Sequence, residues 1–140
     1  MKRAYEELIG DHFAHDRQMA FLSGPRQIGK TTLAGMLLPK ATYYNYDRTD
    51  DALKLGLGPD RVAADAGLDS PAAVRKGVIF DEIHKFPKWK RFLKGFFDAY
   101  GKGLNVAVTG SARLNVYKRG GDSLMGRYFP YRIHPLSVGE

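Results

Sequence analysis

The chain has 140 residues, of which 44% are hydrophobic and 12% aromatic, enough to bury the core of one compact domain. It has no cysteine, which excludes disulfides and thiolate metal sites, and no apolar run of signal-peptide or membrane-span length, so we expect a cytoplasmic protein with no membrane segment. The 22 Lys and Arg against 15 Asp and Glu give a net charge of +7, which indicates either a polyanionic partner, a nucleotide or a nucleic acid, or simply a basic solvated surface.

The order of the predicted elements is that of an α/β domain. Runs of β-forming residues alternate with helical patterns, as in a domain built on a parallel sheet. Strands are predicted over Met19–Ser23, Thr42–Tyr46, Val78–Asp81, Leu104–Thr109 and Tyr128–His134. The third and fourth strands contain unbroken apolar runs, which is typical of central strands covered on both faces.

A glycine-rich loop follows the first strand. It consists of Gly24, Pro25, Arg26, Gln27, Ile28, Gly29, Lys30, Thr31 and Thr32, and it matches the pattern G-x-x-x-x-G-K-[ST]. A helix is predicted from Lys30 to Leu38, ending at Pro39. In such a loop backbone N–H groups surround a phosphate, the lysine reaches the β- and γ-phosphates, and the first threonine hydroxyl ligates Mg²⁺. The loop therefore predicts a site for a polyphosphate with magnesium.

Two adjacent acids, Asp81 and Glu82, follow the third strand. Ligands in parallel α/β sheets collect at the carboxyl ends of the strands. The first acid is placed to hold Mg²⁺ and the second to deprotonate a water that attacks the γ-phosphate. A kinase would also need a site for the acceptor substrate, and the sequence has no lid or acceptor signature.

The clearest helix follows Pro87. Its apolar stripe consists of Trp89, Phe92, Leu93, Phe96, Phe97 and Tyr100, with Lys88, Lys90, Arg91 and Lys94 on the other side. A solvated face is the simpler interpretation of these cations, and contact with nucleic acid is a weaker hypothesis. Between residues 48 and 76, Ala-rich and acidic stretches suggest short helices.

Polar residues also mark the ends of the last two strands. Thr109 and Ser111 end the strand in "NVAVTGSAR", where either hydroxyl can reach a γ-phosphate or its attacking water. Arg127 stands just before the strand in "GRYFPYRIHPLS", where a surface ion pair is the simple alternative to a functional role.

In this order, "GPRQIGKTT", "IFDEIHK", "VTGSARLNVYKRGGDSLMGR" and "YRIHPLS" resemble a group of prokaryotic AAA+-type ATPases that carry a poorly characterised C-terminal domain. The resemblance implies a P-loop NTPase three-layer sandwich with strand order 5-1-4-3-2. It also implies that Lys30 and Thr31 are Walker A residues, Asp81 and Glu82 the Walker B pair, and Ser111 or Thr109 the first sensor. By the same resemblance Arg127 is an arginine finger, which reaches the nucleotide of a neighbouring subunit. Relatives have either Gln or His where His84 stands, so the role of His84 stays open.

The family also has a helical lid and a C-terminal domain after this core, so we expect residues 1–140 to be an ATPase core and a fragment of a longer protein. Binding weakened by loss of the lid, and little turnover, are expected of the 140-residue chain. The alternative function is a nucleotide-dependent switch or interaction module, with a nucleic acid or an acidic protein as partner. Intact Lys30, Thr31, Asp81 and Glu82 argue against a purely structural core.

Overall fold

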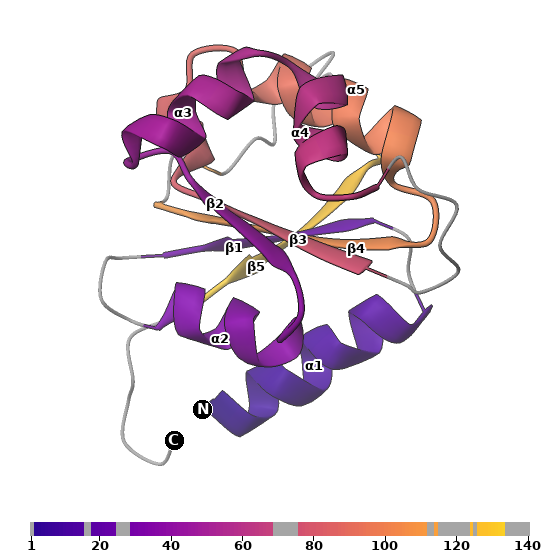
Figure 1. Ribbon diagram of the computed structural model, residues 1–140. Coiled ribbons are helices and arrows are strands. Elements are labelled where there is room, and N and C mark those ends of the chain that lie inside the picture. The colour runs from indigo at the N-terminus through magenta and orange to yellow at the C-terminus, as the bar shows by residue number, and fades with distance from the viewer. Residues whose placement is uncertain are drawn as a thin grey trace.

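The computed structural model of the chain is a five-stranded sheet with helices on both faces (Figure 1). The structure describes residues 2–15, 18–24, 29–68, 76–111, 114, 124 and 126–133. None of the described helices is both long enough and apolar enough to cross a bilayer.

The described elements alternate between helix and strand for most of the chain. The strands are β1 (Met19–Ser23), β2 (Thr42–Asn45), β3 (Lys76–Asp81), β4 (Leu104–Gly110) and β5 (Tyr128–Arg132). The helices are α1 (Lys2–His15), α2 (Lys30–Leu37), α3 (Thr49–Gly56), α4 (Pro59–Asp65), the short 3₁₀ turn η1 (Ile83–Lys85) and α5 (Trp89–Tyr100).

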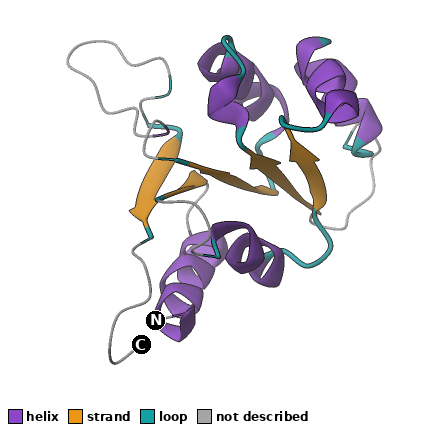
Figure 2. Ribbon diagram, turned by 90° about the vertical axis from the view of Figure 1, so that its left-hand side faces the viewer, coloured by secondary structure: helices purple, strands orange, loops and turns teal. Residues whose placement is uncertain are grey.

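All neighbouring strands are parallel, in the order β2-β3-β4-β1-β5. This confirms the predicted order 5-1-4-3-2, counted from the other edge. The α/β fold class and the three-layer sandwich are also confirmed: α3, α4 and α5 cover one face and α1 and α2 the other, with the sheet between them (Figures 1 and 2).

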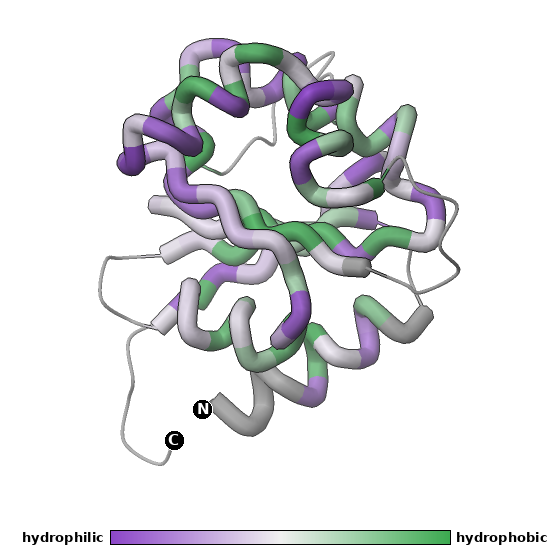
Figure 3. Tube along the Cα trace, viewed as in Figure 1, coloured by the Kyte–Doolittle hydropathy of each residue, from purple (hydrophilic) through white to green (hydrophobic). Residues whose placement is uncertain are grey.

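Both faces of the central strands are apolar because successive side chains point to opposite sides. In β3, Val78 and Phe80 pack with the α3–α5 layer, whereas Ile79 packs with the α1–α2 layer. In β4, Val106 and Val108 likewise face the first layer and Ala107 the second. Hydrophobic positions therefore concentrate along the middle of the sheet (Figure 3).

The predicted elements differ from the described ones mainly at their ends. The second strand ends at Asn45, one residue before the predicted Tyr46, because a turn begins there. The third begins earlier, at Lys76, and the fourth extends to Gly110. The last strand stops at Arg132, and His134 lies outside the described residues.

Helix α5 follows its sequence pattern, whereas helix α1 was not predicted. On α5 most of the expected apolar stripe is buried, with Phe97 and Tyr100 partly buried, whereas Arg91 and Lys88, which stands just before the helix, are exposed. Helix α1 was not anticipated, because it carries a short apolar face: Ile9 and Phe13 pack beneath the sheet, and His12 donates to the carbonyl of Gln18 through Nε2 at 2.6 Å.

Candidate phosphate-binding site

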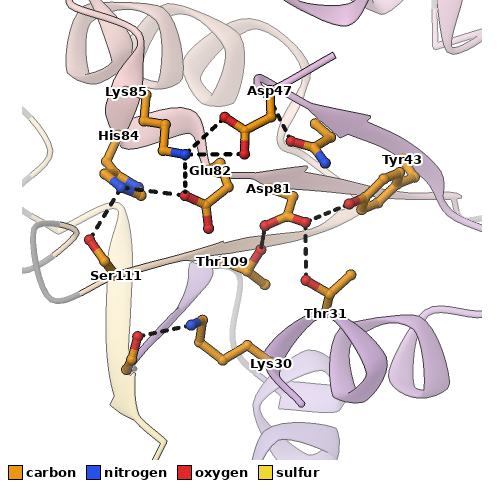
Figure 4. A network of polar contacts seen from close by, with 12 residues as sticks. Lys30, Thr31, Tyr43, Asp47, Asp81, Glu82, His84, Lys85, Thr109 and Ser111 are labelled. Carbon is orange, nitrogen blue, oxygen red and sulfur yellow. Dashed lines mark hydrogen bonds and ion pairs between the residues drawn. The ribbon is translucent and has the colours of Figure 1, made fainter. Parts of the chain in front are cut away.

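The candidate site lies at the carboxyl edge of the sheet, where four adjacent strands, β2, β3, β4 and β1, end side by side. Ser23 of β1 is in register with Gly110 of β4, and Thr109 of β4 with Asp81 of β3. Asn45 at the end of β2 is in turn paired with Asp81. The strand order thus brings residues separated by up to 87 positions in sequence to one edge, and the groups around them are drawn in Figure 4.

The start of α2 faces this edge. Gly29 precedes the helix with φ +85°, a left-handed conformation that side chains disfavour, and α2 begins at Lys30. Lys30 is only 6% exposed, and its Nζ donates to the carbonyl of Gly24 at 2.8 Å. The ammonium group therefore lies against the backbone just after β1, and Lys30 itself is at the positive end of the α2 dipole. Residues 25–28, the remaining predicted loop positions, lie outside the described residues.

A pocket of about 400 Å³ opens at this edge of the sheet. Its lining is mainly polar and consists of Gly29, Lys30, Thr31, Thr32, Asn45, Asp47, Asp81 and Glu82. The size falls within the range of sites for small ligands and cofactors.

Asp81 accepts hydrogen bonds from three hydroxyl groups. Thr31 donates to Oδ2 at 3.0 Å, Tyr43 to the same oxygen at 2.5 Å, and Thr109 to Oδ1 at 2.8 Å (Figure 4). Burial, together with the hydrogen bond to Asp81, raises the pKa of the Tyr43 hydroxyl above its ordinary value, so Tyr43 remains a donor. Thr109 is 0% exposed, so its hydroxyl is committed to Asp81.

Glu82 contacts a different set of side chains from those around Asp81. Among the described residues it is the one non-glycine with positive φ, at +60°, which turns the chain sharply after β3. Its Oε1 lies 3.3 Å from Lys85 Nζ and 3.6 Å from His84 Nε2. The Lys85 ammonium also donates to both carboxylate oxygens of Asp47, at 2.9 and 3.1 Å. The hydrogen bond to Asp47 is the main reason that the pKa of Lys85 is raised.

His84 connects Glu82 to the end of β4. Its side chain is 4% exposed, and Nε2 lies 3.2 Å from the Ser111 hydroxyl as well as near Glu82. Gly110 leaves the room that the imidazole occupies, since a Cβ there would lie 2.6 Å from His84 Nδ1. Thus the two sensor candidates differ in place: Thr109 contacts Asp81, and Ser111 contacts the histidine beside Glu82.

Arg127 does not lie with these residues. It immediately precedes β5, whose first residue Tyr128 is in register with Met19 at the beginning of β1. The phosphate loop follows the other end of β1, so the length of a five-residue strand, about 15 Å, separates the two places. On this opposite edge, Arg127 forms a two-pronged ion pair with Asp98 of α5, at 2.7 and 3.1 Å. The guanidinium holds the pKa of Asp98 below its usual range.

The donor set of the pocket fits a magnesium ion with a polyphosphate. Mg²⁺ prefers hard oxygen ligands and is usually held by one or two carboxylates together with phosphate oxygens. The Thr31 hydroxyl and the Asp81 carboxylate already lie in contact at 3.0 Å, in the pocket that Lys30 also lines.

Sequence reasoning did not include four neighbours of these residues: Tyr43, Asp47, Lys85 and Asp98. Only Lys85 carried a signal, since it lies three residues after Glu82 and so can reach it across one turn. The other three depend on strand register or on packing between elements far apart in sequence.

Comparison with known proteins gives one positive result. A family model described as an AAA domain matches residues 16–140, from just before β1 to the end of the chain. No curated protein matches the chain.

The match covers most of the chain, and the sheet has the strand order that the resemblance implied. The lysine and hydroxyl groups that a phosphate site requires also surround one pocket. The chain belongs to the AAA domain family and is a nucleotide-binding module of the AAA-type ATPases.

Proposed function

We propose that the chain is the part of an ATPase that binds Mg-ATP and hydrolyses its γ-phosphate. The observation that carries this proposal is the meeting of Lys30, Thr31, Asp81 and Glu82 around one pocket at the carboxyl edge of the sheet. A site that only held phosphate would need the first three residues. Glu82 adds a base that does not share Asp81's partners.

Each residue has a role that follows from its place. Lys30 binds the β- and γ-phosphate oxygens as a point charge, and the backbone at the start of α2 adds N–H donors. Thr31 and Asp81 would hold Mg²⁺, which supplies charge neutralisation of the phosphates when bound. Thr109 and Tyr43 orient the Asp81 carboxylate through their hydrogen bonds.

Glu82 is the general base in this proposal. It accepts a proton from water as the water oxygen bonds to the γ-phosphorus and the bond from that phosphorus to the β–γ bridging oxygen breaks, leaving ADP and phosphate. Ser111, which contacts His84 beside Glu82, is the better placed of the two sensor candidates.

Arg127 enters this reaction only from a neighbouring subunit. Its position on the far edge of the sheet favours the arginine-finger role in trans, and thus self-association of the protein. Arginine fingers contribute about 10³ to 10⁵ in rate in phosphoryl transfer.

A direct test measures binding and turnover separately. Titration calorimetry with ATP and Mg²⁺ should show that Lys30→Ala abolishes binding, whereas Glu82→Gln retains it. Phosphate release should fall by about 10²-fold or more in Glu82→Gln, the usual range for loss of a general base. Glu7→Gln, an exposed acid of α1, is the matched control and should match the wild type. Undiminished phosphate release in Glu82→Gln would exclude Glu82 as the base.

A second function, a nucleotide-dependent switch with very slow turnover, is favoured by one observation. Glu82 is held by Lys85 and His84, and Arg127 by its own chain's Asp98, so neither group is directed at a phosphate within one chain. If ATP changes assembly or partner affinity while phosphate release stays very slow, the switch is the correct description. A change in affinity for DNA would support the weaker idea of a nucleic-acid partner.

A further inference from the structure

A groove of about 540 Å³ lies on the face of the molecule formed by α3, α4 and α5, the upper layer in Figure 1. Its floor is apolar and is made by Leu55 of α3, Pro59 of α4, and Phe86 and Phe92 around the start of α5. Phe92 and Leu55 belong to the core, so the floor is rigid. Among the residues that the structure describes, no acidic side chain lines this groove.

Three cations stand along the α5 side of the groove: Lys88, Arg91 and Lys94. Lys94 lies 3.5 Å from Asp98, a loose pair between exposed side chains. Lys88 and Arg91 are exposed, and within the described part of the chain no carboxylate lies within ion-pair distance of either. Their charge is therefore available to an anionic partner.

The apolar surface extends past the groove. Leu57 lies between the lining residues Gly56 and Gly58 and is 61% exposed. The two glycines flank Leu57 in the turn between α3 and α4, and a Cβ at Gly56 would meet nothing within 4 Å. An apolar surface that continues outside a pocket suits a polypeptide segment better than a small molecule.

A nucleic acid fits this surface less well. Proteins that bind single strands offer aromatic faces on which bases stack. Here the rings are already used within the fold: Phe86 stacks on Tyr46, with centroids 5.5 Å apart at 16°, and packs edge-on against Phe92 at 6.1 Å. The cations without a stacking surface favour carboxylates beside apolar side chains.

We propose that this groove binds a segment of another polypeptide that carries acidic side chains next to one or two large apolar ones. The apolar side chains occupy the floor at Phe86 and Phe92, and the acids pair with Lys88 and Arg91.

The groove also adjoins the phosphate site. Phe86 directly follows Lys85, which pairs with Glu82 and Asp47, and its stacking partner Tyr46 directly precedes Asp47. A bound segment therefore contacts residues next to both Lys85, which pairs with Glu82, and Asp47, which holds Lys85. Any effect of the segment on turnover rests on the proposed function, whereas binding itself does not.

The test selects peptides from a displayed random library on the nucleotide-free chain. The recovered peptides should be enriched in Asp or Glu together with Phe, Leu or Trp. Their affinity, measured by fluorescence anisotropy, should fall at least about tenfold in the double variant Lys88→Glu and Arg91→Glu, because two attractive charges become repulsive. The double variant Lys40→Glu and Lys102→Glu changes the net charge equally at exposed sites outside the groove, and it should bind normally.

A second variant tests the groove by shape. Gly56→Tyr places a ring over the floor at a helical position with open space, and should also weaken binding about tenfold. Gly10→Tyr makes the same change at an open glycine of α1, under the sheet, and should have no effect. Thermal unfolding verifies that each variant folds.

Four outcomes overturn the proposal. The proposal is wrong if the recovered peptides lack acidic residues, or if they bind the groove variants as tightly as they bind the wild type. It is also wrong if a dT₂₀ oligonucleotide binds the wild type and the Lys88 and Arg91 changes abolish that binding, which would identify a nucleic-acid surface. The last refuting outcome is a dimer in sedimentation that these changes dissociate, which would identify a second copy of the chain as the occupant. If the wild-type protein binds the peptides but does not hydrolyse ATP, that result counts only against the proposed function.

Discussion

Replacing Thr109 with valine tests whether the hydroxyl groups around Asp81 hold the site together. The change removes the donor at 2.8 Å from Oδ1 while nearly keeping the side chain's shape. A hydrogen bond to a charged group contributes about 1.5–3 kcal/mol. Since Asp81 keeps Thr31 and Tyr43, we expect a loss near the lower end, about 1.5–2 kcal/mol. For a chain of this length that lowers the melting temperature by about 5–8 °C.

The assay is thermal unfolding followed by circular dichroism, without nucleotide or magnesium. Thr31→Val is the matched control, because Thr31 is exposed and its bond to Asp81 is longer, so its loss should cost only about 0.5 kcal/mol. A double-mutant cycle with Asp81→Asn isolates the Thr109–Asp81 contact and should give a coupling of about 1 kcal/mol or more. The reasoning fails if Thr109→Val melts like the wild type, or if the Thr109 and Asp81 changes are additive.

Three further outcomes are expected. Gly110→Ala should displace His84 and destabilise the fold by about 1–3 kcal/mol in urea unfolding. Gly35→Ala, where a helical Cβ meets open space, should not destabilise it, and equal stabilities of the two variants would contradict the close contact between Gly110 and His84. The hydrogen bond from the Tyr44 hydroxyl lowers the pKa of Asp65 below its ordinary value of 3.8, so the ionised carboxylate stabilises the fold above that pH and this stabilisation is lost as pH falls through the pKa of the folded state. The melting temperature of Asp65→Asn should therefore depend less on pH below about pH 4 than that of the wild type, and parallel curves would refute this. Asp98→Asn should release Arg127 and raise phosphate release of the assembled protein up to about fivefold, the scale of one exposed ion pair, and an unchanged or lower rate would show that the pair does not restrain Arg127.

The fold could be predicted well because its signals are local. Unbroken apolar runs such as Val78–Phe80 identify central strands, and the α5 stripe identifies a helix. The order of the strands came from the family resemblance, since nothing local states that β4 lies between β1 and β3. Helix α1 was missed because its buried face is short and its N-terminal half is rich in charge.

The candidate site divides in the same way. Residues in one contiguous motif, such as Lys30 with Thr31 or Asp81 with Glu82, can be proposed from sequence, and the structure places them around one pocket. Their roles stay predictions. Tyr43 could not be found in advance, because its contact with Asp81 depends on the β2–β3 register.

The position of β4 has a consequence for how the protein is made. Both neighbours of β1, namely β4 and β5, come from residues after 103, whereas β2 and β3 can pair with each other earlier. During synthesis β1 therefore remains without a partner strand until β4 has emerged from the ribosome. The phosphate loop is translated before β4, yet its pocket takes shape only when Gly110 reaches Ser23. A nascent chain stalled before β4 should carry the whole loop sequence and still fail to retain ATP.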